Sequence, residues 1–188
     1  MRLYRQVVED YSLYSGCELT QEQLQSLHTD AGRVSAKMRA VRIVAASGVS
    51  RRDLEQRLVR KGEDPEQARE AVQWMEELKL VDDRQTARQI VERCIARGYG
   101  RSRARQLLYE KQIPASLWEE ALEGYPDQLE PVLSFLRNKL SDPADRAQVK
   151  KCVDALLRKG HSYGVIRKAL ARLGSHTEEF PEEEQWQE

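Results

Sequence analysis

Four arginines fall within nine residues in the stretch ARGYGRSRARQLL, residues 96–108, beside two glycines. Guanidinium groups bind phosphate and carboxylate oxygens through paired hydrogen bonds, and the start of a helix offers free backbone N–H groups to an anion. The chemistry that these residue types could perform is therefore anion binding. The alternative is that the arginines only keep one short helix soluble, and this stretch alone does not decide between the two.

The charges of the chain are segregated, although its 31 basic and 31 acidic residues balance. Residues 84–111 hold eight basic and two acidic residues, and residues 146–172 hold eight basic and one acidic residue. The last thirteen residues, HTEEFPEEEQWQE, contain six glutamates and no Lys or Arg. Basic blocks beside an acidic tail indicate a polyanionic partner, and ordinary solvated helix faces are the alternative.

The sequence contains no pattern typical of a catalytic or metal site. The three cysteines and three histidines are scattered, which predicts neither a disulfide framework nor a metal centre. Asp82 and Asp83, in VDD, come closest to a pair of catalytic carboxylates. We interpret them instead as caps of a helix that begins near Arg84. We therefore predict no catalytic residue, no metal and no cofactor.

Two features indicate where the protein works. No window approaches the roughly eighteen apolar residues that a membrane span requires, and the first residues lack the apolar segment of a signal peptide. Scattered cysteines fit a reducing compartment. We expect a soluble, cytoplasmic and monomeric protein without a membrane contact.

Short helices must position the basic residues. Asp64 before Pro65 is typical of a helix start, and Asp142 before Pro143 repeats the device. Residues 20–23 form a Thr–Gln capping box. Alternation that would favour a strand is confined to residues 3–8. The sequence predicts an all-α protein whose helices are too short to be stable alone and therefore pack on one another.

Three of these helices belong to an internal repeat. The segments SGVSRRDLEQRLVRKG (47–62), RGYGRSRARQLLYEKQ (97–112) and KGHSYGVIRKALARLG (159–174) align without a gap. Each has a glycine, an N-cap residue two positions later, and then two apolar residues four positions apart. The aligned N-caps are Ser50, Gly100 and Ser162. A helix start at each of them could offer N–H groups to a phosphate or carboxylate.

The basic residues of the repeats lie outside the apolar arc of each helix. On a helical wheel, Arg103 and Arg105 flank opposite sides of that arc, and Arg52, Gln56 and Arg60 point outward. Their apolar stems would lie along the edge of the core while the charged ends reach water. The predicted residues for contact with a protein or DNA partner are Arg52, Arg60, Arg97, Arg101, Arg103, Arg105, Arg167, Lys168 and Arg172.

The order of these motifs resembles that of the RecX family of regulatory proteins. The segments that carry the resemblance are RRDLEQRLVRKG, LKLVDD, Ala87, RGYGRSRARQLL, KQIP and LLRKGHSYGVIRKAL, within residues 35–173. The resemblance implies a curved array of three-helix repeats without catalytic activity that binds the RecA recombinase, especially its filament on single-stranded DNA. Departures from the family pattern are Thr86 for an aromatic residue, Gln112 for a glycine and His161 for a phenylalanine.

We predict repeats at 33–82, 83–125 and 126–175, after an N-terminal extension (1–32) and before an acidic, disordered tail (176–188). A protein that lies along the filament and fixes one subunit arrangement would inhibit ATP hydrolysis and strand exchange, and its contacts would include single- or double-stranded DNA. Two alternatives stay open. One is a helix-turn-helix protein that reads duplex DNA through Gln56 and Gln106, and the other is a helical scaffold for unrelated proteins.

Overall fold

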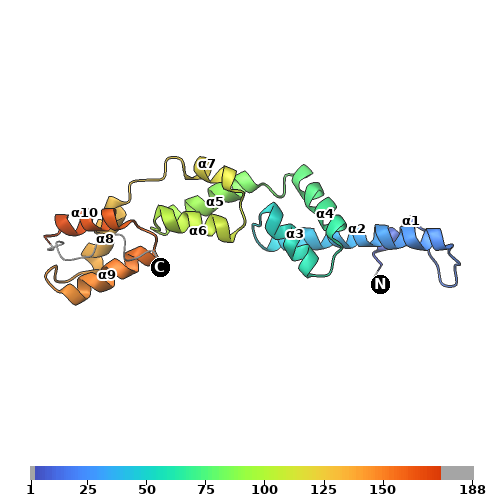
Figure 1. Cartoon of the computed structure of the whole chain (residues 1–188). Helices are drawn as coiled ribbons and strands as arrows, with labels where there is room; N and C mark the ends of the chain where they lie inside the picture. Colours follow the sequence, from blue (N-terminus) through green and yellow to red (C-terminus); the bar gives the residue numbers. More distant parts are fainter. Residues whose placement is uncertain (1–2, 175–188) are drawn as a thin grey trace. The chain divides into compact units, whose positions relative to one another are not determined.

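The computed structural model describes residues 3–174, and every regular element within them is helical (Figure 1). The α-helices are α1 (Arg5–Asp10), α2 (Gln21–Ala46), α3 (Arg51–Arg60), α4 (Pro65–Glu77), α5 (Asp83–Ala96), α6 (Arg101–Glu110), α7 (Trp118–Leu122), α8 (Leu129–Lys139), α9 (Arg146–Arg158) and α10 (Tyr163–Arg172). A short 3-10 helix, η1 (Ala115–Leu117), precedes α7. The predicted all-α fold is confirmed, and no helix in the described range is long and apolar enough to cross a membrane.

The chain divides into two compact units. The first contains α1 to α4 and the segment Lys111–Ile113, and the second contains α6 to α10 with most of α5. The strand considered for residues 3–8 is wrong, because residues from Arg5 onward form α1. Helix α2 is continuous from Gln21 to Ala46 and therefore crosses residue 32, where the N-terminal extension was predicted to end. The predicted acidic tail lies outside the described residues.

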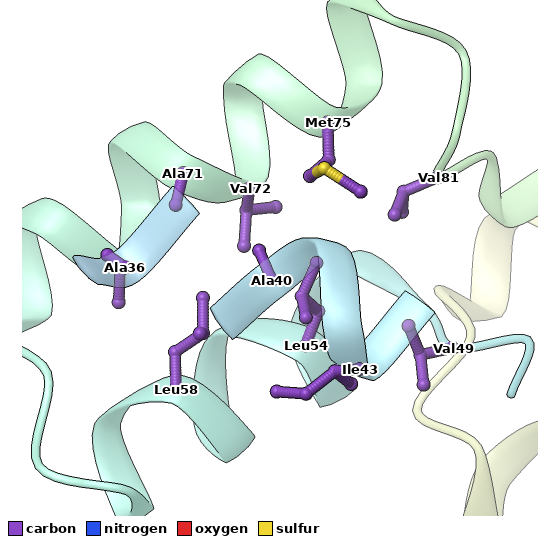
Figure 2. Close-up of a cluster of buried hydrophobic side chains, with 11 residues drawn as sticks. Ala36, Ala40, Ile43, Val49, Leu54, Leu58, Ala71, Val72, Met75 and Val81 are labelled. Carbon is purple, nitrogen blue, oxygen red and sulfur yellow. The ribbon is translucent and has the colours of Figure 1, made fainter. Parts of the chain in front are cut away.

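The core of the first unit joins α2, α3 and α4. In Figure 2 the buried side chains of α4, among them Ala71 and Met75, face the small residues Ala36 and Ala40 of α2. Small side chains allow the two helix backbones to approach closely. Leu54 and Leu58 of α3 are completely buried in the same cluster. Replacing either leucine with alanine would cost roughly 2–5 kcal/mol.

The second unit contains a comparable core between α8, α9 and α10. Leu133 and Leu136 of α8 pack with Leu156 of α9 and with Ile166 and Leu170 of α10, and all five are almost fully buried. Each helix contributes apolar residues at three- and four-residue spacing, as an amphipathic helix requires. One face of each of these three helices is therefore buried in the core, and the charged residues lie on the remaining surface.

Most predicted helix starts are confirmed. Thr20 and Gln23 form the capping box, Asp64 accepts hydrogen bonds from two N–H groups of α4, and Ser50 and Ser162 cap α3 and α10.

The predicted start of α9 at Asp142 and Pro143 is wrong. Asp145 is the N-cap, and its Oδ1 accepts hydrogen bonds from the N–H groups of Ala147 and Gln148 at 2.9 and 3.2 Å. The carboxylate of Asp142 instead accepts from the N–H of Ala144 in the preceding turn. The helix therefore begins three residues later than predicted, at the second aspartate. The Asp–Pro pattern alone could not show which of the two aspartates is the N-cap.

Candidate anion-binding surface

Helix α6 is anchored in the core by its apolar residues, and its arginines lie beside this buried face. Ala104 and Leu108, one turn apart, are completely buried. Arg101 and Arg105 occupy positions one turn apart on another side of the helix, and about half of each side chain is exposed. This half-exposed state of Arg101 and Arg105 fits the expectation that the arginine stems lie along the edge of the core while the charged ends reach water.

Each of the three arginines of α6 forms an ion pair with a glutamate of the same unit. Arg101 Nη2 lies 3.3 Å from Glu119 Oε2, and Arg105 Nη2 donates a hydrogen bond to Oε1 of the same carboxylate. Arg103 Nη1 lies 3.2 Å from Glu110 Oε1. Sequence reasoning missed Glu119, because it belongs to α7 and a helical wheel of α6 contains no information about it. The positive charge of α6 is therefore partly neutralised within the protein.

Helix α10 presents a more open basic face. Ser162 Oγ accepts a hydrogen bond from the N–H of Val165, and the buried face of the helix packs in the core described above. Arg167 and Lys168 are exposed, and neither forms an ion pair with an acidic residue between positions 3 and 174. Arg172 Nη1 lies 3.7 Å from Glu130 Oε1, a long and exposed pair. Most of the charge on α10 is available to an external anion.

Helix α3 of the first unit gives a mixed result. Arg52 and Arg60 are exposed, as predicted, and neither forms an ion pair with a described acidic residue. The prediction that Gln56 points outward like them is wrong. Gln56 Oε1 accepts a hydrogen bond from Gln112 Nε2 at 2.8 Å, so its amide is occupied within the unit.

Arg97 lies just beyond α5, in the turn before α6. Its side chain is exposed and forms no ion pair with an acidic residue in the described range. Burial raises the pKa of the nearby Cys94 thiol, while the positive charges of Arg103 and Arg97 act in the opposite direction. A buried thiol with a raised pKa is a poor nucleophile, which is consistent with a structural role for this cysteine.

Equivalent turns of the second and third repeats contact each other. The N–H of Gly100 donates a hydrogen bond to the carbonyl oxygen of Lys159 at 2.8 Å. A side chain at Gly100 would collide with the backbone of Gly160, and one at Gly160 would collide with Arg103. The N–H of Gly100 is thus occupied inside the unit. The predicted use of this helix start for anion binding is wrong for that group.

His161 is buried in the same contact. Its Nε2 lies 3.1 Å from the carbonyl oxygen of Gly98, and its Nδ1 is buried without a hydrogen-bond partner in the described structure. Burial lowers the pKa of His161, and the nearby charge of Lys159 lowers it further, while the hydrogen bond to Gly98 acts in the opposite direction. The lowered pKa favours the neutral imidazole, and its contact with Gly98 links the two turns.

The carboxylates of Asp82 and Asp83 accept hydrogen bonds from backbone N–H groups. Asp82 Oδ1 accepts hydrogen bonds from the N–H groups of Arg84 and Gln85 at 2.8 and 3.1 Å, which confirms the capping interpretation for this residue. Asp83 Oδ1 accepts a hydrogen bond from the N–H of Arg51 at the start of α3. Desolvation raises the pKa of Asp83, and the hydrogen bond with Arg51 opposes that shift. Between residues 3 and 174, no three His, Cys, Asp or Glu side chains converge as a metal site would require.

A second residue that sequence reasoning missed is Tyr109, near the end of α6. Its side chain is 73% exposed, the highest value among the large apolar and aromatic residues that the structure describes. It occupies a position one turn beyond Arg105 and two turns beyond Arg101, so the three share one side of the helix. The alignment of the repeats could have drawn attention to it, because the aligned residues are Val59 and Ala171.

Comparison with known proteins gives a consistent result. The model of the family domain "RecX, second three-helix domain" matches residues 82–122. The regulatory protein RecX of Chlorobaculum tepidum is 33% identical over 145 residues, which cover 75% of this chain and 90% of that protein. The regulatory protein RecX of Halorhodospira halophila is 28% identical over 158 residues, covering 81% of this chain and 98% of the relative.

Solved structures share the fold. The crystal structure of a regulatory protein RecX has a TM-score of 0.68 and 22% sequence identity, and the match covers 89% of this chain and 87% of that one. The crystal structure of RecX from Lactobacillus salivarius has a TM-score of 0.64 and 21% identity, and the match covers 76% and 97%. At these identities the likeness establishes the helical fold and leaves the surface chemistry to be argued from the residues of this chain.

Proposed function

The chain belongs to the RecX family of regulatory proteins, and from this premise we propose that it regulates the RecA recombinase without being an enzyme. It binds RecA and the RecA filament on single-stranded DNA in the cytoplasm. By binding one arrangement of the filament more tightly than others, it inhibits ATP hydrolysis and strand exchange, since a ligand shifts an equilibrium toward the state that it binds best.

The observation that supports this proposal is the exposure of basic residues on the corresponding short helix of each successive repeat. Arg52, Arg101 and Arg167 are examples from α3, α6 and α10. A filament is itself a repeating partner and presents the same acidic protein surfaces and phosphates at regular intervals. Several weak contacts on one chain then add up, because the first contact raises the effective concentration for the next.

The energetic demand of such regulation is modest. Slowing ATP turnover tenfold requires a difference of about 1.4 kcal/mol between the affinities for the two filament states. Exposed ion pairs contribute up to about 1 kcal/mol each, so two or three differential contacts are sufficient. No buried ligand site is required, which is consistent with function on an exposed helical surface.

Fluorescence anisotropy with three probes tests the proposal: duplex DNA, single-stranded DNA, and single-stranded DNA coated with RecA. We expect the tightest binding to the coated strand, and we expect the protein to co-sediment with the filament. Preference for duplex DNA of one sequence would favour the helix-turn-helix alternative. Absence of binding to all three probes would favour the scaffold alternative and contradict the proposal.

A further inference from the structure

Two arginines of α6 share one carboxylate of α7. Arg101 and Arg105, on successive turns, contact different oxygens of Glu119, as described above. Glu119 itself is 70% exposed and is held only at the edge of the unit. The two guanidinium groups therefore converge on a point in solvent where an anion is already bound, and that anion belongs to the protein.

The carboxylate of Glu119 is easily displaced from this position. Ion pairs between exposed side chains contribute little net free energy, because water screens them and both side chains lose conformational freedom. Phosphate and carboxylate accept the same paired hydrogen bonds from guanidinium groups. A phosphate group of a partner can consequently take the place of Glu119 while the two arginines keep nearly the same directions.

Tyr109 indicates that the phosphate belongs to a single-stranded nucleic acid. Its ring lies on the side of α6 that carries Arg101 and Arg105 and is 73% exposed, so most of its surface is open to a partner. An exposed aromatic ring beside cationic side chains matches the stacking platforms on which single-stranded nucleic acids place their bases. An acidic protein surface would use the arginines and would have no need for the ring.

We propose that Arg101, Arg105 and Tyr109 form a site for one nucleotide of a single-stranded nucleic acid, and that Glu119 is its internal competitor. The phosphate replaces the Glu119 carboxylate between the two arginines, and the adjacent base stacks on Tyr109. The inference rests on the proposed function, because it assigns the DNA partner of one of the basic helices considered there. The Glu119 carboxylate lowers the affinity of this site for a single phosphate. A strand that also binds neighbouring basic residues can displace the carboxylate.

The test is fluorescence anisotropy of a labelled oligothymidine with the full-length protein at low salt. Replacing Glu119 with Gln (Glu119→Gln) should tighten binding about threefold, the gain expected from releasing exposed ion pairs. Glu123→Gln is the matched control, since it removes the same charge from an exposed residue that has no ion pair in the described structure. Tyr109→Ala should weaken binding about fivefold or more, whereas Tyr109→Phe should preserve it, because stacking uses the ring and not the hydroxyl.

Two results would overturn the inference. One is equal affinity of Glu119→Gln and Glu123→Gln, which would reduce the effect of Glu119 to net charge. The other is unchanged binding of Tyr109→Ala to the bare oligonucleotide, which would favour an acidic protein surface as the partner of α6. Co-sedimentation of the wild-type protein with the RecA filament is measured separately. Failure of that assay alone would reject the proposed function, while the oligonucleotide results would still decide the role of Glu119.

Discussion

Helices α6 and α10 occupy equivalent positions in successive repeats, yet they differ in what their basic residues contact. In α6, Arg101 and Arg105 are bound to Glu119. In α10, Arg167 and Lys168 have no acidic partner among residues 3–174. Similar runs of basic residues in the sequence thus correspond to different amounts of available charge. What a basic helix offers to a partner depends on the helices packed beside it.

The starts of the two helices differ as well. Ser162 caps α10 with its own side chain. Gly100 at the start of α6 has no room for a side chain, because the turn of the third repeat fills the space where one would lie. One helix start is therefore capped by its own side chain, whereas the N–H group at the other is bound by backbone of the neighbouring repeat. The same sequence pattern therefore begins a helix in two different ways, although the turns before both helices contact each other.

The largest expected effect breaks the connection at Gly100. Gly100→Ala should lower the free energy of unfolding by about 3 kcal/mol, because the added methyl group collides with backbone that cannot easily move. Gly164→Ala in α10 is the matched control: nothing lies within 4 Å of that position, and alanine in a helix is favoured over glycine by about 1 kcal/mol. Urea denaturation measures both variants. Equal stability of the two would show that the turns are not in close contact.

The second effect concerns binding. Arg167→Glu with Lys168→Glu should weaken binding to single-stranded DNA at least about tenfold, if each exposed contact contributes about 1 kcal/mol. The dependence of the logarithm of affinity on the logarithm of salt concentration should flatten by about 0.7 for each lost phosphate contact. Arg101→Glu with Arg105→Glu should flatten it less, because Glu119 already neutralises part of that charge. The comparison fails if the α6 variant has the larger effect.

The smallest effect is a dependence of stability on pH through His161. Its pKa in the folded protein lies below the ordinary value of 6.5, so between pH 7 and pH 5.5 a larger fraction of the unfolded chain than of the folded chain is protonated at this residue. The free energy of unfolding should therefore fall as the pH falls through this range. Urea denaturation at the two pH values measures it.

Substitution of His161 tests whether its buried imidazole is the source of this pH dependence. His161→Phe should reduce the loss of stability on acidification, because phenylalanine fills the site without titrating. An equal pH dependence in the wild type and in His161→Phe would exclude the buried imidazole as its source.

The sequence was most informative where structure depends on near neighbours in the chain. Capping at Thr20, Ser50 and Asp64 follows from residues two or three positions apart, and all three caps were correctly predicted. The apolar spacing likewise predicted which faces of the helices are buried. The start of α9 was wrong because two aspartates compete within three residues, and only the folded backbone selects Asp145.

Contacts between elements could not be predicted in the same way. Glu119 binds the arginines of α6 from a different helix, and Gln112 binds Gln56 across 56 positions of the sequence. Neither follows from periodicity, because a helical wheel treats each helix alone. The side of the helix on which a basic residue lies was therefore predictable. Whether that residue forms an ion pair depends on neighbouring helices, as Arg101 and Arg105 of α6 show by their ion pairs with Glu119 of α7. The domain boundaries and the partner residues themselves stay predictions.

The central claim is that basic helices of successive repeats contact the RecA filament, with α10 more available than α6. The direct test is ATP turnover by RecA on single-stranded DNA, titrated with wild type and with three double variants of equal helicity by circular dichroism. These are Arg167→Glu with Lys168→Glu, Arg101→Glu with Arg105→Glu, and a control of equal charge change at exposed residues outside α6 and α10, Arg42→Glu in α2 with Lys79→Glu after α4. We predict full inhibition by wild type and control, weaker inhibition by the α6 variant, and the weakest by the α10 variant. Inhibition by the α10 variant equal to that of the wild type would contradict the account.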